Sequence, residues 1–154
     1  MLTKFVGQLS ATNNEGENPF HIVAKSKYDR ARTVEVAQIL VEMYELQRPD
    51  TSNKAALPWF TRSDEGSPLR FAINHQNEQL ALYFLRLDGI YFVSENCEDD
   101  LVYLAVENGC SQVAQEILDM VDRHSLTQLL TIDNGRTVLH VAPRSTGQIC
   151  NLAY

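Results

Sequence analysis

Cysteine and basic residues are scarce in this chain. Its three cysteines, Cys97, Cys110 and Cys150, are an odd number without close spacing, which excludes a disulfide framework and a zinc module and favours a reducing, cytoplasmic location. The 13 Lys and Arg residues are outnumbered by 20 Asp and Glu residues, which gives a formal net charge of -7. An acidic chain repels a phosphate backbone or an anionic bilayer, so nucleic acid is not expected as the main partner.

Long apolar runs and catalytic motifs are missing as well. The most apolar short runs, such as A-L-Y-F-L at 81–85, are far shorter than the ~18 residues that a membrane span needs. Residues 1–10 are too polar for a secretory signal, so we expect a soluble chain without membrane insertion. The phosphate-loop, dinucleotide-binding, nucleophile-elbow and zinc-protease motifs are absent from the sequence. We therefore expect no enzyme activity, no catalytic residue, no cofactor and no metal site.

The remaining candidates for chemistry have structural interpretations. The acidic run at 95–100 directly precedes an expected helix, where carboxylates complement the helix dipole. His21 and His140 lie in similar turn-helix segments at opposite ends of the chain, so we interpret them as turn-stabilising residues and not as metal ligands. We expect His75 to be exposed on a helix.

An internal repeat organises the chain, which is long enough and apolar enough to fold as a single domain over 1–154. Residues 67–85 align with residues 100–118 without a gap, and the apolar positions recur with a period of about 33 residues. One such segment cannot bury its apolar face alone, so the copies must stack on one another.

Two further copies match the same template. The first copy has N-P-F-H-I-V-A at 18–24 and V-E-V-A-Q-I-L-V-E-M at 34–43, and an insertion at 25–33 lengthens the connection between its helices by about five residues. The last copy begins with D-N-G-R-T-V-L-H-V-A at 133–142. Asn18-Pro19 and Ser67-Pro68 are expected helix starts, because Asn or Ser caps a helix and Pro suits its first position.

These motifs resemble the ankyrin-repeat family over residues 14–142, and they are similar to plant ankyrin proteins of the accelerated-cell-death type. The resemblance implies an all-α solenoid of about three and a half stacked helix-turn-helix repeats. Arg70 and Tyr103 depart from the family pattern, which has a turn-stabilising His at these positions. The expected divisions are an N-terminal capping helix at 1–13, repeat 1 at 14–46, an inserted loop at 47–62, repeat 2 at 63–95, repeat 3 at 96–130 and an incomplete repeat 4 at 131–154.

Ankyrin repeats generally bind proteins, so the resemblance implies a non-catalytic interaction module with a signalling or scaffold role. The expected surface is the concave side formed by turn tips and first helices, and its acidic character favours a basic or polar partner segment. The expected partner-binding residues are Glu15, Glu17, Trp59, Phe60, Asp64, Asn74, His75, Asp99, Glu107, Asn108, Asp133 and Arg136.

Two alternatives stay open at this point. Trp59 and Phe60 in the inserted loop either anchor a partner or fold back over the groove between the first two copies. The whole domain either binds a separate protein or serves as a cytosolic regulatory or assembly domain of a larger membrane signalling protein or channel, attached through sequence beyond this chain.

Overall fold

A computed structural model describes residues 8–27, 29–47, 57–94, 101–120, 131–132 and 136–137. The helices are α2 (Pro19–Lys25), α3 (Arg30–Gln47), α4 (Pro68–Asn74), α5 (Glu78–Ser94), α6 (Leu101–Glu107) and α7 (Ser111–Met120). Two short strands, β1 (Thr131–Ile132) and β2 (Arg136–Thr137), pair antiparallel, with Thr131 opposite Thr137. Residues 8–9 are also helical.

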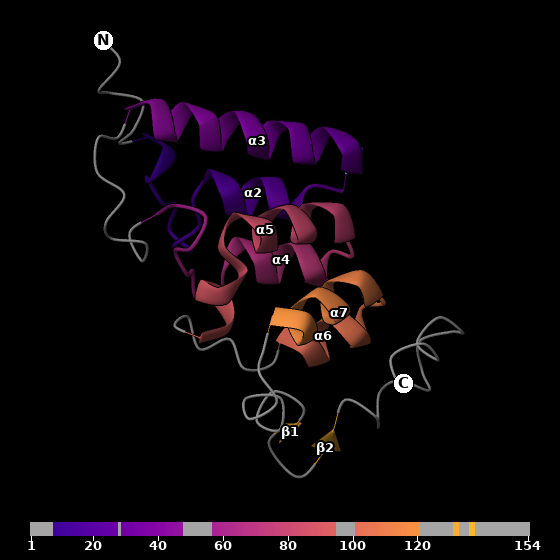
Figure 1. The fold of residues 1–154 in the computed structure, drawn as a ribbon. Coiled ribbons are helices and arrows are strands. Elements are labelled where there is room, and N and C mark those ends of the chain that lie inside the picture. The colour runs from indigo at the N-terminus through magenta and orange to yellow at the C-terminus, as the bar shows by residue number, and fades with distance from the viewer. Residues whose placement is uncertain are drawn as a thin grey trace.

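The helices form three consecutive pairs that stack in two layers (Figure 1). Within the pairs, α2 contacts α3, α4 contacts α5 and α6 contacts α7. Between the pairs, the seven-residue helices α2, α4 and α6 follow one another in one layer, and α3, α5 and α7 follow one another in the second layer. The described part of the chain is therefore all-α apart from the two short strands, and none of its helices has the length and hydropathy of a membrane span.

The helix bounds repeat the period of the sequence. Helix α6 begins about 33 residues after α4, and α7 begins the same distance after α5. Equivalent positions are buried in the same way, because Leu69 and Val102 are both fully buried, as are Ala72 and Ala105. Burying a Leu or Val side chain in this way contributes roughly 1.5–3 kcal/mol to folding. The same apolar pattern therefore builds the core in both pairs.

Two of the short helices begin where the sequence predicts. The side-chain oxygen of Asn18 accepts hydrogen bonds from the backbone N–H groups of Phe20 and His21, at 3.0 and 3.4 Å. Ser67 caps α4 by accepting from the N–H of Arg70 at 3.3 Å. In both helices a proline follows the cap, so its missing N–H costs no hydrogen bond.

The insertion in the first copy differs from the prediction. The connection between α2 and α3 covers only residues 26–29, because Lys25 ends α2 and residues 30–33 form the first turn of α3. Thr33 holds this turn in place, because its hydroxyl donates to the carbonyl oxygen of Arg30 at 2.7 Å and accepts from the side-chain amide of Asn77 at 2.7 Å. The first turn of α3 is thus hydrogen-bonded to the connection between α4 and α5.

Helix α3 lies at one end of the stack and carries apolar side chains on two sides. Ala37, Val41 and Tyr44 are buried, whereas Val36, Ile39 and Leu46 are 43%, 53% and 87% exposed. Other predicted segments lie outside the described residues, namely most of the capping helix at 1–13, residues 48–56 of the inserted loop and nearly all of the incomplete repeat at 131–154.

Candidate functional site

The turns before α2 and α4 touch each other and bring two predicted site residues together. The first turn is closed by the backbone N–H of Asn13, which donates to the carbonyl oxygen of Glu17 at 2.9 Å. The second is closed by two backbone hydrogen bonds between Ser63 and Gly66, at 2.9 and 3.2 Å. A Cβ atom on Gly16 would lie only 3.5 Å from the Cα atom of Ser63. The tips that carry Glu15 and Asp64 are therefore neighbours.

His21 fastens the first turn to the second. Its side chain is fully buried, and its Nε2 atom lies 3.1 Å from the carbonyl oxygen of Gly66. Because a carbonyl can only accept, Nε2 carries the proton, and Nδ1 accepts from the backbone N–H of Asn18 at 3.2 Å. Burial lowers the pKa of His21, which keeps the ring neutral. The interpretation of His21 as a turn-stabilising residue agrees with this geometry.

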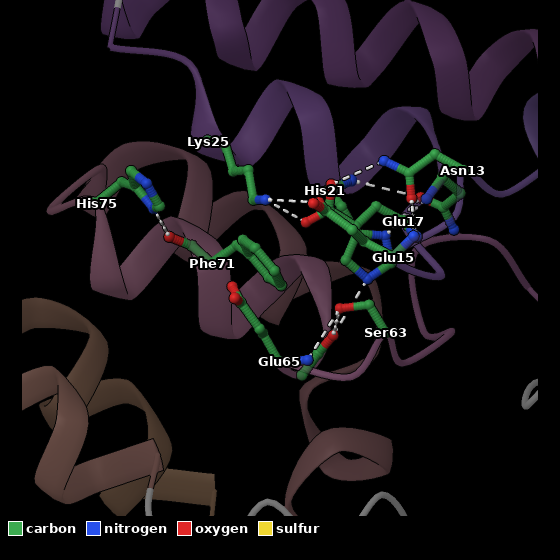
Figure 2. A network of polar contacts seen from close by, with 11 residues as sticks. Asn13, Glu15, Glu17, His21, Lys25, Ser63, Glu65, Phe71 and His75 are labelled. Carbon is green, nitrogen blue, oxygen red and sulfur yellow. Dashed lines mark hydrogen bonds and ion pairs between the residues drawn. The ribbon is translucent and has the colours of Figure 1, made fainter.

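A partly buried ion pair lies beneath the same turns (Figure 2). The carboxylate of Glu17 is only 3% exposed and pairs with the Nζ atom of Lys25, while the side-chain amide of Asn13 donates to its second oxygen at 3.1 Å. The hydrogen bond with Lys25 lowers the pKa of Glu17 and raises the pKa of Lys25. Glu17 is thus charged but covered, which corrects its expected place among the exposed contact residues.

Lys25 connects the turn tips to the face of the short helices. Its Nζ atom lies 3.7 Å from the exposed carboxylate of Glu15 and 5.0 Å from the ring centre of Phe71 in α4. The ring of His75 stacks on Phe71 at 6.4 Å and 5°, and its Nδ1 atom lies 2.9 Å from the Phe71 carbonyl oxygen. A continuous row of polar and aromatic groups therefore runs from the first pair to the second.

The exposed charge at the turn tips is mostly acidic, although the exposed Arg62 lies two residues before Asp64. Glu15, Asp64 and Glu65 are all exposed, and the nearby Lys25 is occupied by Glu17. Rim carboxylates of this kind steer the encounter with a positively charged partner. Glu65 was not predicted, although its place beside Asp64 in the D-E-G turn was a usable signal. Phe71 was not predicted either, because an apolar side chain is typical of a core residue, and Phe71 is 2% exposed.

The other predicted contact residues lie at the far ends of the short helices. Asn74 and Glu107 are exposed at the C-terminal ends of α4 and α6, at equivalent positions of the two pairs. His75 is half-buried and not exposed as expected. Asn108 closes α6 by donating from its side-chain amide to the carbonyl oxygen of Leu104 at 2.9 Å. A seven-residue helix spans about 10 Å, so one helix length lies between this group and the turn tips.

Trp59 and Phe60 do not lie on the surface. They are 4% and 3% exposed, and the Trp59 ring packs edge-on against Phe20 and Tyr44 at 5.7 and 5.5 Å. Of the two alternatives left open by the sequence, the described end of the inserted loop has the one in which these side chains fold back, and Trp59 packs onto the first helix pair. The expectation that these two side chains anchor a partner is corrected, because burial leaves them no surface to offer.

The last predicted contact residues, Asp99 and Asp133, lie outside the described residues, as does the side chain of Arg136. Among the described residues no group of three or more His, Cys, Asp or Glu side chains is placed to hold a metal ion. Cys110 is 1% exposed, and burial raises its pKa to about 11. Its thiol is therefore protonated at neutral pH and unsuited to nucleophilic chemistry.

Comparisons of the chain with known protein families, with curated proteins and with solved structures give no match. The functional interpretation of the site therefore depends on the repeat pattern of the sequence and on the geometry of the turns and short helices.

Proposed function

We propose that this chain is an ankyrin-type repeat module that binds a protein and performs no chemistry. The repeat pattern supports this assignment, since α4 and α6 begin one sequence period apart and three helix pairs stack in series. The contact between His21 and the turn before α4 supports it too, because that turn-helix segment carries the family resemblance. Stacked pairs of this kind present their turn tips and short helices as one extended surface.

The partner surface in this proposal has three exposed carboxylates at its rim and the short helices beside them. The observation that carries the proposal is the contact between the two turns, which places Glu15 next to Asp64 and Glu65 on a rigid support. A rigid acidic rim loses little conformational freedom when a partner binds. The partner chemistry that fits is a basic or polar segment of another protein lying across the turns.

A titration with two labelled peptides tests this proposal. An oligolysine peptide should bind the chain at low salt and weaken as salt rises, whereas an oligoglutamate peptide should not bind. The triple variant Glu15→Gln, Asp64→Asn, Glu65→Gln should bind oligolysine at least about tenfold more weakly. Fluorescence anisotropy measures each affinity.

The matched control removes three exposed carboxylates from α3 with Glu35→Gln, Glu42→Gln and Glu45→Gln. Both triple variants have the same net charge, so a general charge effect would weaken them equally. Equal weakening, or oligolysine binding that ignores salt, would remove the turn tips from the proposed surface.

The alternative, a regulatory or assembly domain of a larger protein, is favoured by α3. Its exposed Val36, Ile39 and Leu46 form an apolar stripe at the end of the stack, of the kind that another folded part covers. If so, the isolated chain should bind an apolar dye, and Ile39→Glu should reduce the binding without lowering stability. A dye signal unchanged by Ile39→Glu would count against this alternative.

A further inference from the structure

A hollow of about 340 Å³ lies between the α2–α3 connection and the α4–α5 connection, at the end of the short helices opposite to the turns. Lys27 and Arg30 contribute two cationic side chains from the first connection and the start of α3. Both are exposed, and no ion pair holds either of them within the described residues. The two positive charges are therefore available to a ligand.

The rest of the lining offers donors and no carboxylate. Asn74 and Gln76 contribute exposed side-chain amides, whereas the amide of Asn77 is buried and donates to Thr33. His75 donates from Nδ1 to the Phe71 carbonyl oxygen, so the Nε2 atom of its neutral ring is an acceptor, and His75 lines the hollow without donating to an anion. In a chain with a net charge of -7, a hollow lined by two cations and no acid is an electrostatic exception.

The two carboxylates at these connections are held elsewhere. Asp29 pairs with Arg32 at 3.4 Å and accepts from the backbone N–H of Ala31 at 3.2 Å. Glu78 accepts from the backbone N–H of Gln112 at 2.7 Å, so it is tied to the start of α7. Neither of them neutralises the cations of the hollow by direct contact.

Gln76 lines the hollow although its backbone has a conformation that disfavours residues with a side chain. Its φ angle is 57°, in the left-handed region, and the equivalent residue one repeat later is Gly109, with φ 76°. Glycine adopts this conformation without a steric penalty, whereas glutamine does not. The penalty is compensated if the Gln76 amide serves a ligand in the hollow.

We propose that this hollow binds a small phosphate monoester, held by Lys27, Arg30 and the surrounding amides. A phosphate group has nearly two negative charges and three strong acceptor oxygens, which matches two cations and several N–H donors. The volume is at the lower end of ligand sites, which range over about 300–1,000 Å³, so a small molecule fits better than a peptide segment. This site shares Asn74 and His75 with the far end of the predicted contact surface but includes none of the three turn-tip carboxylates, so its failure leaves the acidic turn tips untouched.

Calorimetric titration of the purified chain with ribose 5-phosphate, ribose and inorganic phosphate at equal ionic strength tests the proposal. Ribose 5-phosphate should bind, ribose should not, and inorganic phosphate should bind more weakly than the ester. Lys27→Gln and Arg30→Gln should each weaken binding about tenfold or more, since each removes a charge-assisted hydrogen bond. Arg86→Gln on α5 is the matched control, because it removes one exposed positive charge that is not part of the lining.

Gln76→Gly separates binding from folding. It should weaken binding of ribose 5-phosphate and at the same time raise the urea midpoint of unfolding, because the left-handed backbone is then relaxed. Equal binding of ribose and ribose 5-phosphate would overturn the proposal. So would equal weakening by Arg86→Gln and Lys27→Gln, or phosphate ester binding that Gln76→Gly leaves unchanged.

Discussion

The imidazole of His21 at the start of α2 donates to the carbonyl oxygen of Gly66, which belongs to the turn before α4. This hydrogen bond joins residues 45 positions apart and links the first helix pair to the second. Nδ1 lies 3.2 Å from the backbone nitrogen of Asn18 and 2.9 Å from its side-chain oxygen, and burial lowers the pKa of the ring, which keeps it neutral at neutral pH. Stacking of the first two pairs is therefore coupled to the protonation state of one buried side chain.

The first prediction concerns pH. Burial lowers the pKa of His21 from its ordinary value of 6.5. At pH values between the pKa of the folded state and that of the unfolded state, His21 is protonated in the unfolded chain but neutral in the folded chain. The free energy of unfolding should then be constant above about pH 7 and fall as the pH drops below the ordinary value. Urea midpoints at about pH 7.5 and 5.5 measure this loss, at pH values where Glu17 stays ionised.

The variant His21→Gln should lose less stability between the two pH values than the wild type, although it is less stable at both. His75→Gln is the control, and it should keep the loss of the wild type. A pH-dependent loss of the same size in His21→Gln would mean that another group is responsible.

The second prediction concerns the pair of Lys25 and Glu17. Lys25→Met leaves the covered carboxylate of Glu17 without its cation, which should cost about 1–2 kcal/mol of unfolding free energy. The double variant Lys25→Met, Glu17→Gln should recover part of this loss, because the uncompensated charge is then gone. Urea unfolding at neutral pH measures all three chains.

The exposed pair of Arg86 and Glu116 is the control for this comparison. Their oxygen and nitrogen atoms are 3.0 Å apart, but the Arg86 side chain is 65% exposed. Arg86→Gln should therefore leave the unfolding free energy nearly unchanged. Equal losses in Lys25→Met and Arg86→Gln would show that the covered pair behaves as an ordinary surface pair.

The sequence predicts the helix starts and the period but not the local exceptions. Asn18-Pro19 and Ser67-Pro68 start helices because cap and proline chemistry is local to a few residues. The early start of α3 could not be predicted, because the contact of Thr33 with Asn77 that fixes it joins distant parts of the chain.

The exposure of the site residues was predicted only in part, because it depends on contacts between residues that are distant in the sequence. Glu15 and Asp64 are exposed as expected, because turn tips project from a stack whatever their partners are. Glu17 is covered because Lys25 reaches back from the far end of α2, and a composition-based interpretation cannot anticipate that contact. Trp59 is covered because the inserted loop returns to the core, an outcome that the sequence left as one of two alternatives.

The third prediction concerns Trp59, the only tryptophan of the chain. Because its ring is 4% exposed and packs against Phe20 and Tyr44, Trp59→Ala should cost about 3–5 kcal/mol of unfolding free energy. Trp59→Phe should cost clearly less, since it keeps an aromatic ring in the same space. Urea unfolding followed by circular dichroism measures both variants.

The fluorescence of the unmodified chain gives an independent check on this placement. Emission from Trp59 should be blue-shifted and poorly quenched by acrylamide in the folded state, and both properties should be lost on unfolding. Ready quenching of the folded chain by acrylamide, together with an unchanged stability of Trp59→Ala, would show that Trp59 is exposed and would contradict this prediction.

The fourth prediction compares two glycines with positive φ angles. Gly66 has φ 124°, and a Cβ atom there would lie 2.3 Å from Cδ of Arg70, whereas Gly109 has φ 76° and a Cβ atom there would meet nothing within 4 Å. Alanine tolerates the left-handed region of Gly109 at a cost of about 1–2 kcal/mol, but a φ angle like that of Gly66 is accessible almost only to glycine. Gly66→Ala should therefore lower the urea midpoint of unfolding more than Gly109→Ala.

Because Gly66 also accepts from His21, Gly66→Ala should in addition weaken the pH dependence assigned to that histidine, while Gly109→Ala should leave it intact. A midpoint for Gly66→Ala equal to that of Gly109→Ala, with the pH dependence unchanged, would show that the turn relaxes without disturbing the link between the pairs.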